Sequence, residues 1–277
     1  MADTRPARDN DPPIYEIENP DPPDPVLTGH VVVRREAEDL HDAMGMELLF
    51  HAHACVRAFG DFHLALSGGS TPLPFYRRLM VDPAFRDFPW KRTHLWLVDE
   101  RRVPPEDERC NWTQIADLLL DHSDIPPSQA HAIRAMDARA DELYEDELRR
   151  ALAWREKGHD RLDYVLLGMG SDGHTASLFP HSPALAETSR LVAINAGPRV
   201  TPPDRVTMTF PLLNSARYVA VLVSGASKRS TVERVSAAAR SPIVPETIAE
   251  LPVLGVRPVG DAILRWFVDH EACPRVG

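Results

Sequence analysis

Cysteine, long apolar runs and positive charge are all scarce in this sequence. Its three cysteines, Cys55, Cys110 and Cys273, are an odd number without short spacing. They therefore indicate neither a disulfide framework nor a zinc knuckle, and they fit free thiols in a reducing compartment. No run of about 18 uncharged apolar residues could span a membrane, and the N-terminus lacks the basic start and apolar core of a signal peptide. Acidic residues outnumber basic ones by 41 to 31, a net charge of −10, which argues against a nucleic-acid partner. We therefore expect a cytoplasmic protein with neither a nucleic-acid nor a membrane partner.

Proline, by contrast, is abundant, with 26 residues in a chain of 277, about twice the usual share of roughly 5%. Seven of these prolines fall in the first 25 residues, among aspartates and glutamates. Such a segment has too little apolar surface to offset the entropy lost when it becomes ordered. We predict a disordered or peripheral arm at 1–27 and a single folded domain at 28–277, whose core the apolar content of 43% can supply.

Apolar periodicity predicts strands that alternate with helices through the rest of the chain. Helices are expected at 36–59, after Pro72, and at 112–120, 138–156 and 227–238. Strands are expected at 62–66, 93–98, 161–167, 191–195, 205–209, 218–223 and 262–268. Because several strands are continuously apolar, we predict an α/β fold with an open, mainly parallel, Rossmann-like sheet covered by helices on both faces. Ligands bind such sheets beyond the carboxyl ends of the strands, where the sequence places polar loops at 67–72, 99–102 and 168–174.

The first of these loops has the composition of an anion site. Gly68 and Gly69 let successive backbone N–H groups point into one concavity, and Ser70 and Thr71 lead into a helix whose positive end adds to it. No lysine follows the glycines as in a Walker loop, and the spacing does not fit a serine-hydrolase elbow. A plain strand-to-helix turn is the alternative interpretation.

The third loop contains Gly168-x-Gly170-x-x-Gly173, which matches a dinucleotide fingerprint in spacing alone. It lies in the middle of the chain, and Asp172 and His174 stand where a pyrophosphate would need neither charge nor bulk. We instead expect the loop to hold His174 at the edge of the sheet as a general base, with Asp172 or Asp99 orienting its ring. The alternative is a histidine with a structural role in the loop.

Cationic side chains accompany these loops. Arg101, beside Asp99, could stabilise a developing oxyanion, and Arg205 and Lys228 could complete a phosphate pocket. No metal site is expected, because His51 and His53 lie two positions apart on a helix and point in different directions.

Five segments, in this order, resemble the 6-phosphogluconolactonase family over roughly 30–270. They are 67–72 (SGGSTP), 99–101 (DER) with Asn111 downstream, 168–180 (GMGSDGHTASLFP), 205–209 (RVTMT) and 224–228 (SGASK). The resemblance implies an open α/β sheet shared with glucosamine-6-phosphate deaminases. It also implies hydrolysis of 6-phospho-D-glucono-1,5-lactone to 6-phosphogluconate in the oxidative pentose phosphate pathway, without an organic cofactor.

One position separates the two activities of this fold. The deaminases continue after the histidine with an Asn-Glu-Pro sequence that supplies a catalytic glutamate, whereas this chain has Phe179 at that place. The resemblance therefore favours the lactonase over a deaminase-like enzyme. A non-catalytic sugar-phosphate sensor is a third hypothesis. The chain departs from the family pattern at Cys110, where serine is usual, and around 251–257.

These observations give one hypothesis for the site. The phosphate rests on the amides of 68–71 and is held by Arg205 and Lys228, while His174 activates water and Arg101 stabilises the oxyanion. Because the net charge of −10 would repel an anionic substrate, positive potential must be concentrated in this pocket. We expect the sugar phosphate lactone as the partner molecule, and a monomer or weak homo-oligomer.

Overall fold

The computed structural model describes residues 21–197 and 200–275. Most of the predicted arm, residues 1–20, lies outside the described residues, so the boundary at 27 and 28 stays a prediction. The described end of the arm contacts the domain. Val26 N donates to Ser236 Oγ at 3.0 Å, and Arg35 forms an ion pair with Asp21 at 2.8 Å.

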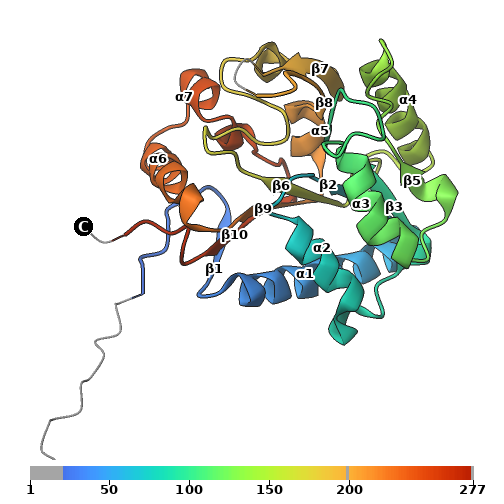
Figure 1. Cartoon of the computed structure of the whole chain (residues 1–277), viewed down its shortest axis with the longest axis horizontal. Helices are drawn as coiled ribbons and strands as arrows, with labels where there is room; N and C mark the ends of the chain where they lie inside the picture. Colours follow the sequence, from blue (N-terminus) through green and yellow to red (C-terminus); the bar gives the residue numbers. More distant parts are fainter. Residues whose placement is uncertain (1–20, 198–199, 276–277) are drawn as a thin grey trace, which may run out of the picture.

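A seven-stranded sheet forms the centre of the molecule (Figure 1), with the strand order β1-β10-β9-β6-β2-β3-β5. All of its pairings are parallel. Its strands are β1 (His30–Arg34), β2 (Phe62–Leu66), β3 (Thr93–Leu97), β5 (Ala130–His131), β6 (Tyr164–Gly168), β9 (Tyr218–Val223) and β10 (Ile263–Asp269). Every residue of β2 and β9 is buried, as apolar strands are when both faces of a sheet are covered. The predicted parallel α/β fold is confirmed.

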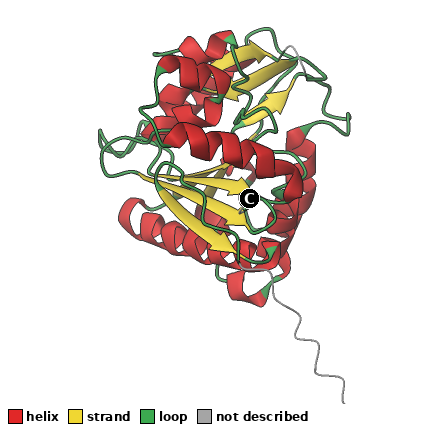
Figure 2. Cartoon of the chain, turned by 90° about the vertical axis from the view of Figure 1, so that its left-hand side faces the viewer, coloured by secondary structure: helices red, strands yellow, loops and turns green. Residues whose placement is uncertain are grey.

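Helices cover both faces of this sheet, as Figure 2 shows. They are α1 (Ala37–Phe59), α2 (Leu73–Val81), α3 (Asn111–Leu119), α4 (Ala140–Leu152), α5 (Phe210–Ser215), α6 (Arg229–Ala239) and α7 (Pro245–Glu250). The stripe of α1 that includes Leu40, Met44 and Leu48 is buried, and the helix ends at Gly60 with φ +90°, a left-handed conformation that glycine adopts without strain. Within the described residues, no helix is both long and apolar enough to cross a membrane.

A second, antiparallel sheet was not predicted. It has the order β4-β8-β7 and consists of β4 (Asp99–Arg101), β7 (Val192–Ala196) and β8 (Asp204–Met208). The strands expected at 191–195 and 205–209 therefore exist, but they pair in this separate sheet. The prediction that 99–102 form a loop is wrong, because 99–101 pair along β8.

A single residue, Val98, joins the two sheets. Its N–H donates to the carbonyl of Leu66 in the large sheet at 3.0 Å, and its own carbonyl accepts from Met208 N at 2.8 Å. The chain therefore passes from β3 to β4 without a break in its hydrogen bonding.

The structure also contains β1, β5, α5 and α7, which the apolar periodicity did not reveal.

Candidate active site

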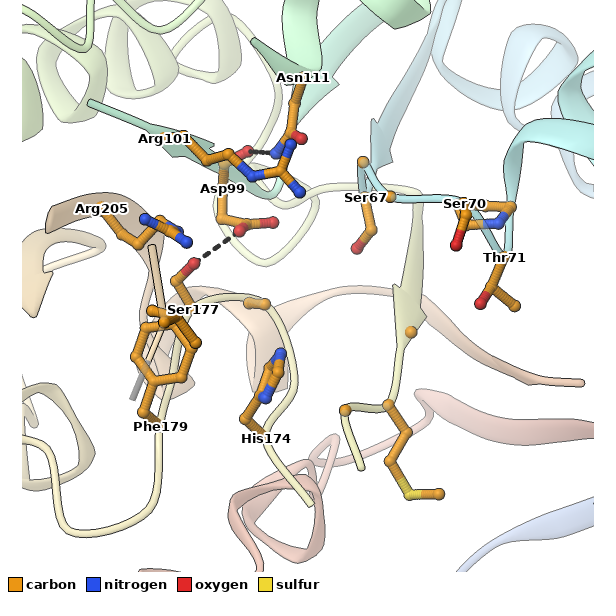
Figure 3. A pocket seen from close by; sticks show the side chains of 18 of the residues that line it. Ser67, Ser70, Thr71, Asp99, Arg101, Asn111, His174, Ser177, Phe179 and Arg205 are labelled. Atoms are coloured by element: carbon orange, nitrogen blue, oxygen red, sulfur yellow. Dashed lines mark hydrogen bonds between the residues drawn. The ribbon is translucent and has the colours of Figure 1, made fainter. Parts of the chain in front are cut away.

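The predicted loops meet in one cavity of about 490 Å³ at the carboxyl ends of the central strands. This volume suits a small ligand. Nine of the ten predicted site residues line it, and they are Gly68, Gly69, Ser70, Thr71, Asp99, Arg101, His174, Arg205 and Lys228. The tenth, Asp172, lies behind His174. In Figure 3, Asp99 and Arg101 face His174 across the cavity, and Ser70 and Thr71 form a further wall.

The glycine-rich loop after β2 is held from both sides. Tyr76 Oη donates to the carbonyl of Ser67 at 2.7 Å. A Cβ at position 68 would lie 2.2 Å from the side-chain amide of Asn111, and Gly69 has φ +94°. Both positions therefore require glycine. The loop leads directly into α2, so its backbone lies at the positive end of a helix, as an anion site needs.

His174 and Asp172 form a closely coupled pair. The Asp172 carboxylate accepts a hydrogen bond from His174 Nδ1 at 2.5 Å and another from the backbone N–H of His174 at 3.1 Å. Because a carboxylate only accepts, Nδ1 carries the proton in the neutral ring, and Nε2 is left with a lone pair. Burial disfavours the ionised form of Asp172, but the hydrogen bond and charge interaction with His174 outweigh it and lower the pKa of Asp172.

The backbone around this pair has no room for side chains at two points. A Cβ at Gly170 would lie 2.1 Å from His174 Nδ1, and one at Gly173, where φ is +92°, would lie 2.6 Å from Leu251 Cδ2. The Gly170 N–H also donates to the carbonyl of His174 at 2.8 Å. Of the glycines in the apparent dinucleotide fingerprint, Gly170 thus makes space for the imidazole and Gly173 makes space for Leu251.

Asp99 contacts a different residue from the one expected. Its Oδ2 accepts from Ser177 Oγ at 2.6 Å, and no hydrogen bond or ion pair joins it to His174 in the part of the chain that the structure describes. Of the two carboxylates expected to orient His174, Asp172 is the one in contact. The alternative role for Asp99 is wrong because its side chain lies on the opposite wall.

Three cations face the cavity without a carboxylate bound to them. Arg101 and Arg205 are directly paired across β4 and β8, and their guanidinium groups donate to the backbone carbonyls of Arg109 and Asp204 respectively. Burial lowers the pKa of Arg205 against the opposing effect of Asp99. Burial also lowers the pKa of Lys228, with Asp172 opposing it. Within 21–197 and 200–275, none of the three forms an ion pair closer than 4.0 Å, so positive potential is concentrated here.

Sequence reasoning did not assign site roles to several other residues of the wall, namely Ser67, Asn111, Ser177 and Phe179. Asn111 Nδ2 donates to the carbonyl of Asp99 at 3.0 Å. The Phe179 ring lies 5.0 Å from the ring of His174 and 6.0 Å from the guanidinium of Arg205. All four belong to the quoted motifs, which were the available signal. Ser67 begins 67–72, Ser177 and Phe179 lie in 168–180, and Asn111 was named downstream of 99–101.

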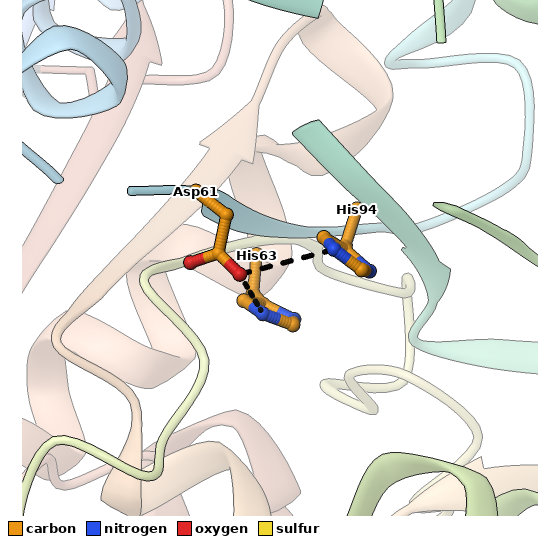
Figure 4. A group of neighbouring side chains, drawn as sticks. All are labelled: Asp61, His63 and His94. Atoms are coloured by element: carbon orange, nitrogen blue, oxygen red, sulfur yellow. Dashed lines mark hydrogen bonds and ion pairs between the residues drawn. The ribbon is translucent and has the colours of Figure 1, made fainter. Parts of the chain in front are cut away.

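A possible metal site lies elsewhere, at the opposite ends of β2 and β3 (Figure 4). Asp61, His63 and His94 offer ligand atoms within 4.8 Å of one another, the one such group among the described residues. However, Trp96 Nε1 donates to His63 Nδ1 at 3.1 Å, so the neutral ring carries its proton on Nε2, which faces Asp61 Oδ2 at 3.2 Å. Asp61 also binds Arg155 at 2.5 Å. These residues fit a hydrogen-bonded cluster better than a metal centre, which needs an unprotonated histidine nitrogen.

The comparisons with known proteins agree with this geometry. The model of the family described as glucosamine-6-phosphate isomerases/6-phosphogluconolactonase matches residues 35–264. The chain belongs to this family. A human relative, named GDH/6PGL endoplasmic bifunctional protein, is 38% identical over 244 residues, which is 85% of this chain but 29% of the length of that protein. The chain therefore spans less than a third of that relative.

Two members of the family match along most of their length. A protein of Synechocystis named 6-phosphogluconolactonase is 38% identical over 77% of this chain and 84% of its own length. The crystal structure of 6-phosphogluconolactonase from Thermotoga maritima superposes with a TM-score of 0.71 at 29% identity, covering 87% of this chain and 99% of that one.

Proposed function

We propose that this chain is a 6-phosphogluconolactonase, which hydrolyses 6-phospho-D-glucono-1,5-lactone to 6-phospho-D-gluconate. The observation that carries this proposal is one cavity in which His174, hydrogen-bonded to Asp172, faces a glycine-rich anion loop and three cations. In the described part of the chain, no carboxylate forms an ion pair with any of the three. The names of the relatives in Synechocystis and Thermotoga maritima support the same activity.

In the proposed mechanism the phosphate binds the backbone N–H groups of 68–71, with Lys228 and Arg205 supplying positive charge. The bound lactone then presents its carbonyl carbon to a water molecule beside His174. His174 Nε2 takes a proton from this water as its oxygen attacks the carbonyl carbon, and Asp172 stabilises the imidazolium that forms. Arg101 stabilises the negative charge that develops on the carbonyl oxygen.

The second half of the reaction returns the proton. The tetrahedral intermediate collapses, the bond from the former carbonyl carbon to the ring oxygen breaks, and the imidazolium of His174 protonates that oxygen. The products are a carboxylic acid, which ionises, and the free hydroxyl of the opened chain. A lactone is an activated ester, so general-base catalysis of about 10²- to 10⁴-fold, together with positioning, suffices.

The buried ring of Phe179 disfavours the deaminase alternative. It is 4% exposed and lies 5.0 Å from the ring of His174 and 6.0 Å from the guanidinium of Arg205, so an apolar ring occupies the place where the resemblance puts the catalytic glutamate of the deaminases. The proposal includes a cytoplasmic location, which three buried free thiols support. It also includes a monomer or weak homo-oligomer, which size-exclusion chromatography tests.

The test is to generate the phosphorylated lactone in situ and to measure acid release above the spontaneous rate. We expect Lys228→Ala to raise KM about tenfold or more, because it removes a charge-assisted contact to phosphate. The control is Arg234→Ala, which should leave KM unchanged. Arg234 lies on α6, more than one helical turn beyond Lys228, and does not line the cavity. Absence of lactone hydrolysis, or ammonia release from glucosamine 6-phosphate, would contradict the proposal.

A further inference from the structure

The middle residue of the Asp99-Glu100-Arg101 strand has no place in the mechanism above. Side chains alternate between the two faces of a strand, so Asp99 and Arg101 line the cavity while Glu100 points away from it. Glu100 is 2% exposed. A carboxylate buried this deeply must be matched by several hydrogen-bond donors.

The donors come from the beginning of α3. Glu100 Oε1 accepts from the backbone N–H groups of Arg101 at 2.7 Å and Asn111 at 2.8 Å. Its Oε2 accepts from Trp112 N at 2.8 Å and from Cys110 Sγ at 3.5 Å. The residue that precedes α3, Cys110, gives no side-chain cap, and the first turn holds no acidic residue. Glu100 therefore supplies both the missing cap and the negative charge that a helix N-terminus favours.

Both ends of the intervening loop carry residues of the cavity wall. Arg101 follows Glu100 directly, and its guanidinium donates to the carbonyl of Arg109 in the same loop at 2.6 Å. At the other end, Asn111 binds the carbonyl of Asp99 and packs against Gly68 of the anion loop. The carboxylate that closes the loop thus fixes where Arg101 and Asn111 stand relative to the anion loop.

We propose that Glu100 is a positioning residue for the lactonase reaction, which acts by clamping the loop between β4 and α3 so that Arg101 points at the reacting carbonyl. The inference rests on the proposed function. It assigns Glu100 no proton transfer and no contact with substrate. Glu100 affects the rate by holding the guanidinium of Arg101 in place.

A double-mutant cycle of Glu100 and Arg101 tests whether Glu100 acts by positioning Arg101. Glu100→Gln keeps the length of the side chain but places an amide N–H₂ against a backbone donor, so one buried N–H loses its acceptor. We expect kcat to fall about tenfold or more, with KM changed less than about threefold because the phosphate contacts lie elsewhere. In an Arg101→Ala background the same substitution should lower kcat by less than about twofold, since coupled residues are not additive.

The matched control is Asp163→Asn. Asp163 is another buried carboxylate, 1% exposed, that accepts from the backbone N–H of His63 at 2.8 Å but lies at the opposite end of the sheet. It should lower the melting temperature without lowering kcat. If Glu100→Gln does not fold, Glu100→Asp keeps the charge, shortens the side chain by one methylene and should show the same coupling to Arg101.

The outcomes are distinct. A fall in kcat that disappears in the Arg101→Ala background supports the inference. A loss that multiplies with that of Arg101→Ala, or that equals the effect of Asp163→Asn, overturns it and leaves the proposed function standing. If the unaltered chain hydrolyses no lactone, the proposed function fails, and the inference fails with it.

Discussion

Two Asp-x-His sequences lie at opposite ends of the same sheet, and their histidine rings differ in hydrogen bonding. In Asp61-Phe62-His63 both ring nitrogens are occupied, because Nδ1 accepts from Trp96 and Nε2 faces Asp61. In Asp172-Gly173-His174 the carboxylate binds Nδ1 alone, and Nε2 has no hydrogen-bond partner among the described residues and lies at a cavity. The residue types and spacing are identical. The difference lies in whether the surroundings satisfy the second nitrogen.

The cations at the two ends differ in the same way. The side chain of Arg155 is 1% exposed and binds both Asp61 and Asp163. Its positive charge is therefore paired with carboxylates of the protein itself. Arg101 and Lys228 instead keep donors directed at a space that a ligand can fill. A polar cluster thus stabilises the fold when its partners are internal, and binds or reacts when one partner is left for the ligand.

The largest expected effect distinguishes the two histidines. His174→Gln should lower kcat by about 10²- to 10⁴-fold, because it removes the general base, and should leave the melting temperature nearly unchanged. His63→Gln should lower the melting temperature and leave kcat of the folded enzyme unchanged. Lactone hydrolysis and thermal unfolding measure both quantities. Equal kcat losses in the two variants would refute the comparison.

The second prediction concerns the amino end of the sheet. Arg155→Met should lower the free energy of unfolding by about 3–5 kcal/mol, because it removes the cation that binds both buried carboxylates and leaves Asp163 with the longer contact to Arg217 at 3.4 Å. Urea unfolding measures this loss, and kcat of the folded fraction should be retained. A stability close to that of the unaltered chain would show that this cluster does not support the fold.

A pair of glycines sharpens the geometry at the reactive end. Gly170→Ala should lower kcat about tenfold to a hundredfold, because the new methyl group would lie 2.1 Å from His174 Nδ1 and must displace the ring. Gly168→Ala is the matched variant, since no atom lies within 4 Å of its Cβ, and we expect a much smaller fall. Similar losses in both variants would argue against a fixed imidazole.

The last prediction concerns a gradual effect, the pH dependence of stability. Burial, with the neighbouring His63 and His131, lowers the pKa of His94 from 6.5 to about 4. Between these values the unfolded chain binds a proton that the native chain does not, so the free energy of unfolding should fall as the pH drops from about 6.5 to 4. His94→Gln should reduce this slope by up to about 1.4 kcal/mol per pH unit. An unchanged slope in urea unfolding at several pH values would contradict the lowered pKa.

The sequence predicted the parallel sheet because its central strands are continuously apolar, and it predicted most cavity residues because glycine-rich loops follow strands β2 and β6. It could not predict the second sheet, since β4 is three residues long and its strand character depends on pairing with β8, more than 100 residues away. Nor could it decide between Asp99 and Asp172. That choice depends on the conformation of Gly173, which places Asp172 beneath the imidazole, and on Ser177, which binds Asp99.

Val98 has a consequence for the dynamics of turnover. One wall of the cavity belongs to the large sheet and the opposite wall to the small one, and the hydrogen bonds of Val98 to Leu66 and Met208 join them into one body. A hinge needs a segment whose backbone torsions can change freely, and this connection has no such segment. The two walls of the cavity are therefore already positioned before the substrate binds. We expect loop movements rather than domain closure to accompany binding and release.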